Sequence, residues 1–255
     1  MNLSSLRVKT AVALLLSAAC VAQAAPPDLW PLAAKAPADL KTDTAALNST
    51  PIPAELKPAA QFQKLFLKIL ATTAAKAQMV APTWVSELRP FIAADRENDP
   101  VAHGTAEVAR AWLARAQMRQ IDLVLHQYYR ENVRFPDQLA FIESSLPEPL
   151  RLDPWGQPWA YKAHAPQGFE KLTGQRYQLG PAHLPDLGPC HTPAALPGWS
   201  LAVRHLGDKR VLEIRTGSTT ATLQPGGKTG VYTLLYLGDR WALLAGPDQL
   251  FAVTF

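Results

Sequence analysis

Glycine is absent from the first 103 residues of the chain, and all 14 glycines lie at or after Gly104. Because glycine supports tight turns, the chain changes character near that residue. Cysteine occurs only at Cys20 and Cys190, so disulfides contribute little and a hydrophobic core has to hold the fold. With 48% hydrophobic and 18% charged residues, the 255-residue chain suits one large or two small globular domains.

A strong excess of one charge is also missing, because 25 lysines and arginines face 21 aspartates and glutamates. Nucleic acid and anionic lipid bind basic residues that gather on one face, so we expect neither as a main partner. The chain also lacks the glycine fingerprint of dinucleotide sites, the nucleophile elbow of hydrolases and the paired histidines of zinc proteases. We therefore expect no enzymatic activity, no cofactor and no small-molecule substrate.

Three residues that lie close together in sequence, His183, Cys190 and His191, could each offer a zinc ligand. A structural zinc site needs four ligands, and no fourth ligand stands at the usual spacing. We therefore expect no metal site and interpret this segment as a loop between two domains.

The apolar run near the N-terminus, residues 11–21, is shorter than the roughly 20 residues that a membrane-spanning helix needs. It follows Arg7 and Lys9 and precedes Ala22-Gln23-Ala24, which is the order of a secretory signal peptide. We expect export to the periplasm, with cleavage after Ala24. As an alternative, Ser17-Ala18-Ala19-Cys20 resembles a loose bacterial lipobox, which would make the protein an outer-membrane lipoprotein acylated at Cys20.

Hydrophobic spacing predicts a linker and then helices in the first half of the chain. Residues 25–58 hold seven prolines without a clear period, which is typical of an extended linker. Apolar residues at helical spacing predict an amphipathic helix over about 59–80. A long helix over about 105–132 carries two apolar stripes on different sides, so we expect it to pack against two partners at once. The stripes are Val108, Trp112 and Ala116, and then Met118, Ile121, Leu125 and Tyr128.

After Pro136 the pattern changes to a short amphipathic piece, 137–145, and then to alternating segments separated by glycine, aspartate and proline. Such separators are typical of hairpins, so the strands are expected to pair antiparallel. The predicted strands are 158–163, 175–180, 199–206, 209–216, 219–224, 230–237, 240–245 and 249–255.

One stretch combines aromatic, proline and glycine residues in an unusual order. The long helix ends at Phe135-Pro136, a tight turn follows at Asp153-Pro154-Trp155-Gly156, and Pro158 opens a strand that carries Tyr161. Pro154 presets its φ for the turn, Gly156 can adopt a positive φ, and the aromatic rings can close over the helix. A Tyr-x-Leu-Gly strand, 177–180, comes next.

This order resembles the globular domain of the major pseudopilin of type II secretion systems and related type IV pilin-like proteins. The likeness covers residues 105–188 and implies a long helix packed on a small antiparallel sheet. Residues 198–255 more weakly resemble the secretin-contacting homology-region domains of secretion-clamp and pilus-assembly proteins. Because closure removes exposed strand edges, we expect this C-terminal segment to form a small β-barrel.

The chain departs from the pseudopilin pattern at three places. Val133 stands where the family usually has glycine, so the end of the long helix is expected to differ. The prepilin leader is absent, so we do not expect polymerisation as a pilin. The family's acidic calcium-binding loop would follow Gly180, but residues 181–188 contain a single carboxylate, Asp186, which is too few for a calcium shell.

Together these features predict an α+β protein in five parts. The expected parts are a signal peptide (1–24), a Pro/Ala-rich linker (25–58), a helical segment (59–104), a pseudopilin-like domain (105–188) and a small all-β domain (198–255). The resemblance implies an exported structural or adaptor component of a type II secretion or type IV pilus-like envelope machine, whose partners are proteins of that machine. Membrane contact is expected only if Cys20 is acylated.

Recognition by strand addition would need an exposed edge, because main-chain hydrogen bonds then supply the affinity. The candidate edge runs through Val231, Tyr232, Leu234 and Tyr236. A rival hypothesis is an exported hydrolase or glycan-binding module that uses Trp155, Trp159 and Trp241 as stacking platforms. A cleft lined by two carboxylates and an exposed tryptophan would favour this rival, whereas buried tryptophans and a shallow surface would favour the scaffold.

The two export hypotheses predict different N-termini for the exported protein. Signal-peptide cleavage after Ala24 gives a chain that begins at Ala25, whereas lipidation gives a chain that begins at an acylated Cys20. Intact mass spectrometry of the exported protein is expected to give the mass of residues 25–255. A heavier species whose extra mass disappears in Cys20→Ser would contradict cleavage after Ala24.

Overall fold

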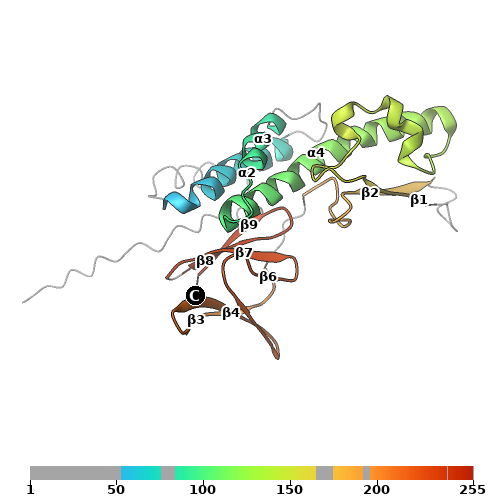
Figure 1. The fold of residues 1–255 in the computed structure, drawn as a ribbon. Coiled ribbons are helices and arrows are strands. Elements are labelled where there is room, and N and C mark those ends of the chain that lie inside the picture. The colour runs from blue at the N-terminus through green and yellow to red at the C-terminus, as the bar shows by residue number, and fades with distance from the viewer. Residues whose placement is uncertain (1–52, 76–83, 165–174, 192–195, 240, 255) are drawn as a thin grey trace, which may run out of the picture.

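A computed structural model describes residues 53–75, 84–164, 175–191, 196–239 and 241–254. The predicted signal peptide, Cys20 and most of the predicted linker lie outside these ranges. Within them, helices and small antiparallel sheets confirm the α+β class (Figure 1). In this part of the chain, no helix combines the length and the apolar character that a membrane span requires.

Helices dominate the first half of the described chain. A 3-10 turn, η1 (Ala54–Leu56), leads into α2 (Lys57–Ala75), and α3 (Val85–Ala93) and the long α4 (Pro100–Asn132) follow. The predicted linker is therefore wrong for residues 53–58, which belong to this helical start and bury Leu56. Helix α4 begins five residues before the predicted start, so the expected boundary between 104 and 105 falls inside it.

Both ends of α4 have a clear local cause. At its start the Asp99 carboxylate accepts hydrogen bonds from the amides of Val101 (3.0 Å) and Ala102 (3.1 Å), and Pro100 occupies the first helical position. At its end Val133 adopts a left-handed conformation with φ of 56°. A β-branched residue is strained there, whereas glycine adopts this conformation readily.

Helix α4 takes part in two hydrophobic cores, as its two stripes predict. Val108, Trp112 and Ala116 belong to a core shared with α2, α3 and strands near the C-terminus. Met118, Ile121 and Leu125 belong to a second core, which the segment after the helix closes. The long helix is thus the axis along which the two halves of the molecule are arranged (Figure 1).

The second core is covered by two 3-10 turns and a two-stranded sheet. The turns are η2 (Leu139–Ser145) and η3 (Glu148–Leu150), and the strands are β1 (Ala160–His164) and β2 (Arg176–Gly180). The strands pair antiparallel with Tyr161 opposite Leu179. The long helix on a small antiparallel sheet is therefore present where the sequence predicts it.

The C-terminal segment forms two further antiparallel sheets, one of three strands in the order β3-β4-β5 and one of four in the order β6-β7-β8-β9. Their strands are β3 (Ser200–Leu206), β4 (Lys209–Thr216), β5 (Thr219–Leu223), β6 (Lys228–Thr229), β7 (Tyr232–Leu237), β8 (Trp241–Ala245) and β9 (Leu250–Thr254). Most predicted boundaries agree with these within two residues. The expected barrel is not confirmed, because the pairing described here gives two separate sheets.

The four-stranded sheet is the middle of three layers. Along β8, Leu243 faces the helices, whereas Ala242 and Leu244 face the three-stranded sheet. Leu235 of β7 faces the helices as well, and a bulge between Leu234 and Tyr236 sets Tyr236 on that same side. Residues 198–255 therefore share a core with the N-terminal helices, which differs from the separate all-β domain that we expected.

Helix α4 packs closely on the middle layer at Gly104. A Cβ atom at this position would collide with the side chain of Leu235, which is 2% exposed. Glycine therefore permits the helix and the sheet to pack at this separation, although it lowers helix propensity.

Replacement of Val133 with glycine should stabilise the protein by about 0.5–1 kcal/mol, because it removes the left-handed strain at some cost in chain entropy. Val133 is 79% exposed, so little packing is lost. Urea unfolding measures the change. The matched control is Leu123→Gly at a position that is 64% exposed inside α4, where glycine should cost about 1 kcal/mol. Equal destabilisation by both variants would contradict the prediction.

Candidate functional site

The aromatic corner, defined here by Trp155, Trp159 and Tyr161, closes over the second half of α4. Trp159 is 7% exposed, and its indole Nε1 donates to the carbonyl of Leu150 at 3.0 Å. Tyr161 donates to the carbonyl of Pro136 at 2.8 Å. All three side chains pack on the core that contains Leu125, as the sequence predicts.

Asp153 and Gly156 give the corner its shape. The Asp153 carboxylate accepts hydrogen bonds from the amides of Trp155 and Gln157, both at 2.9 Å, and from Ala182 at 3.3 Å. Gly156 has a φ of 76°, as the turn requires. Asp153 is 4% exposed, so this carboxylate ties the turn to the segment after β2 and is not available for acid-base chemistry with a substrate.

Burial of the corner changes the ionisation of Tyr161. Its surroundings raise the pKa of Tyr161 to about 12, chiefly through burial and then through the nearby Asp137 and Tyr128. The phenol therefore stays protonated and keeps donating to Pro136 across the physiological pH range.

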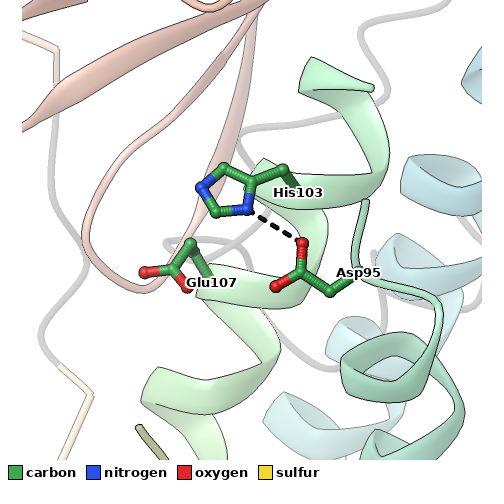
Figure 2. Close-up of side chains that lie close together, drawn as sticks. All are labelled: Asp95, His103 and Glu107. Atoms are coloured by element: carbon green, nitrogen blue, oxygen red, sulfur yellow. Dashed lines mark hydrogen bonds and ion pairs between the residues drawn. The ribbon is translucent and has the colours of Figure 1, made fainter. Parts of the chain in front are cut away.

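A second group of polar side chains lies where α3 meets α4. Asp95, His103 and Glu107 bring their ligand atoms within 4.8 Å of one another, and Figure 2 shows His103 and Asp95 in contact. The His103 Nδ1 to Asp95 Oδ1 distance is 2.9 Å. A carboxylate, an imidazole and a second carboxylate at this spacing could hold a divalent cation.

Arg110 already supplies the positive charge of this group. Its guanidinium lies 2.7 Å from Asp95 and 2.6 Å from Glu107, while the Trp155 indole donates to both Glu107 oxygens, at 3.0 and 3.1 Å. Burial would raise the pKa of Asp95, but His103 and Arg110 together hold it below its ordinary value. We therefore interpret this group as an ion-pair network that links the α3–α4 junction to the aromatic corner.

A third group is more deeply buried and joins three distant segments. The side chains of Arg115 and Asp248 form an ion pair and are each 8% exposed. Arg115 also donates to the carbonyls of Gly188 and Cys190, while Trp112 donates to the carbonyl of Asp248 at 2.8 Å. The His191 Nδ1 lies 2.9 Å from the same Asp248 carboxylate. We call Arg115, His191 and Asp248 the buried junction.

The three residues considered for zinc do not come together as ligands. His183 packs edge-on against Trp155, Cys190 is exposed near Arg119, and His191 enters the buried junction. The buried His191 Nε2 has no hydrogen-bond partner among the described residues, and the ring packs against Trp112 and Phe66. The contacts of His191 are therefore those of a buried structural side chain, which packs on two aromatic rings and pairs with Asp248.

The predicted partner edge needs correction. Strand β7 lies inside its sheet, paired with β8 on one side and with β6 at Tyr232 and Thr233 on the other. Leu234 is fully buried, and Tyr232 and Tyr236 are half-buried, whereas Val231 is 61% exposed. Strand β6 therefore occupies this edge at Tyr232 and Thr233, and an added strand could not pair along the whole of β7 without displacing β6.

Sequence reasoning identified the aromatic corner and missed the two polar groups. Asp248 and Arg115 are 133 residues apart, and Trp155 and Glu107 are 48 apart. In the sequence, each of these charged residues has the neighbours of an ordinary solvent-exposed helix or turn residue. No local pattern therefore predicts that it is buried or paired. One signal was the pair Trp112 and Ala116 on a separate stripe, which predicts a second contact surface in this part of α4.

Truncation of Asp248 should strongly destabilise the protein. Asp248→Ala leaves the Arg115 charge buried without its partner, at a cost of about 3–5 kcal/mol. In the control Asp239→Ala, the lost pair with Arg210 involves a carboxylate that is 91% exposed, so the cost should stay below about 1 kcal/mol. Urea unfolding of both variants measures these costs, and equal losses would contradict a structural role for the junction.

The same ion pair should make the free energy of unfolding depend on pH in the acidic range. Burial would raise the pKa of Asp248, but the His191 hydrogen bond and the Arg115 charge lower it overall. A folded pKa below the unfolded value of about 3.9 contributes stability at neutral pH, which is lost as pH falls through the folded pKa. Unfolding experiments between about pH 2 and 7 should therefore show a shallower acid dependence in Asp248→Asn than in the unaltered protein.

Comparisons with known protein families, with curated proteins and with solved structures find no match to this chain. The likeness to the pseudopilin domain therefore rests on the residues of the aromatic corner and on the order of helix, turn and strands.

Proposed function

We propose that the protein is an exported structural or adaptor component of a bacterial type II secretion or type IV pilus-like envelope machine, and that it acts by binding other proteins. The observation that carries the proposal is the packing of the aromatic corner on α4. Trp159 and Tyr161 follow the turn and donate to the carbonyls of Leu150 and Pro136, which precede it, and the corner packs on the same core as the second half of α4. This is the arrangement that the pilin-like resemblance implies.

The covered N-terminal half of α4 supports an accessory role rather than a polymerising one. Phe66 of α2 packs edge-on against Trp112 of α4, and the four-stranded sheet covers α4 around Gly104. A helix enclosed in this way has little apolar surface left for bundling with the helices of other subunits. The domain would therefore act beside a filament or channel.

The positions of the tryptophans also favour the scaffold over a glycan-binding module or hydrolase. A stacking platform needs an open ring face, but Trp159 is buried and Trp155 donates to Glu107 while packing against His183. Trp241 lies against Tyr236, with ring centroids 5.3 Å apart, and packs on the first core. These rings contribute to stability through burial.

Strand β3 is the best-placed edge for a partner strand. It is an outer strand of the three-stranded sheet and pairs with β4 over seven residues. Ala202, Arg204 and Leu206 are exposed along it. Main-chain bonds from an added strand would supply affinity, and side chains such as Leu206, which is 59% exposed, would supply selectivity.

Site-specific photo-crosslinking in cells tests the proposal. A photoreactive phenylalanine analogue at Leu206 or Phe141, both exposed apolar positions, should capture proteins of the envelope machine. The same analogue at Glu97, an exposed polar position at the α3–α4 junction, serves as the control. Identical background at all three positions, or glycan cleavage by the purified protein, would contradict an adaptor role.

A further inference from the structure

A cavity of about 440 Å³ opens where α4 meets β2 and the chain segment 185–189. This volume falls within the range of sites that enclose a small group or a side chain. Its deeper lining is apolar, because Met118 is 2% exposed and Leu187 is 6% exposed, and Leu179 adds a half-buried side chain. The cavity is therefore a built feature of the second core.

Two carboxylates line the same cavity, Asp122 on α4 and Asp186 in the segment after β2. The Tyr177 hydroxyl donates to Asp122, which fixes the orientation of this carboxylate. Asp186 is exposed and takes part in no ion pair within the described part of the chain. Among the described residues, no lysine or arginine lines the cavity.

Two arginines near the cavity are directed elsewhere. Arg115 is bound to Asp248 and to two carbonyls, and Arg119 lies against the Cys190 sulfur. His126 stands 3.7 Å from Asp122 on the helix surface. Burial raises the pKa of Asp122 despite this histidine, which indicates that its surroundings do not fully compensate the charge.

We propose that this cavity receives an arginine or lysine side chain of a partner protein. The inference rests on the proposed adaptor function for its partner, and it deepens that function by naming the chemistry of the contact. An arginine or lysine combines an apolar stem with a charged head, and this matches an apolar floor beneath two carboxylates. A neutral sugar would bring no positive charge to Asp186, and an acidic group would be repelled by both carboxylates.

The purified full chain, labelled with ¹⁵N, tests the chemistry by NMR titration with N-acetyl-L-arginine amide. The expected result is a saturable shift of the Gln178, Leu179 and Gly188 amides. N-acetyl-L-glutamine amide, a neutral control probe, should produce no such shift. Equal shifts with both probes, or shifts with calcium chloride and none with the arginine probe, would overturn the proposal.

Variants separate the carboxylates from the fold. D122N/D186N should weaken binding of the arginine probe about tenfold, because it removes two partly exposed carboxylates, each of which can contribute up to about 1 kcal/mol to an ion pair. Asparagine still accepts the Tyr177 hydrogen bond, and an unchanged melting temperature verifies folding. The matched control D208N/D239N, on the C-terminal sheets, should bind as before. Unchanged affinity in D122N/D186N would overturn the proposal.

A photo-crosslinker at Gln178, on the cavity rim, tests the contact in cells. The captured partner segment should contain an arginine or lysine, and capture should fall about tenfold in D122N/D186N. Partners captured at Leu206 or Phe141 but not at Gln178 would overturn the cavity proposal and leave the adaptor function intact. Binding of the arginine probe, together with no envelope partner at any position, would support the cavity chemistry and contradict the adaptor function.

Discussion

The buried ion pair between Arg115 and Asp248 is the contact on which the arrangement of the molecule depends. It lies where the long helix, the segment 188–191 and the turn between β8 and β9 meet. Buried charges are costly unless each is paired and hydrogen-bonded, and here Arg115, His191 and Trp112 all contribute bonds to the Asp248 residue. Such a junction tolerates few alternative packings of the three segments.

The long helix connects this contact to both hydrophobic cores of the molecule. Its first half is buried under α2, α3 and the four-stranded sheet, and its second half is buried under the aromatic corner. Because different faces are buried along its length, the helix as a whole lacks a single apolar stripe, although each half has one. The part from α4 to β2 and the C-terminal sheets are consequently parts of one structure that shares a helix.

The local features of the fold could be predicted from the sequence, but the contacts between segments could not. Turn residues and alternation located the strands, and the aromatic corner follows from Asp153, Gly156 and Tyr161 themselves. The barrel was expected because alternation alone does not say which strand faces which layer. In β8, Leu243 and Leu244 are both buried because both sheet faces are covered, and this depends on α4, more than 100 residues away. Likewise, neither the cavity beside Asp122 nor the junction at Asp248 has a pattern within one segment.

The bulge in β7 determines which side chains of this strand face the helices and which face the three-stranded sheet. Without the extra residue, Leu234 and Tyr236 would point to the same layer, and Leu235 alone would reach the helix at Gly104. With it, a one-residue slip of this strand would carry Leu234 out of the inter-sheet core and set Thr233 or Leu235 in its place. Insertions or deletions are therefore far less tolerable in this strand than in the hairpin turns around it, and a homologous chain should preserve its length even where the residue types differ.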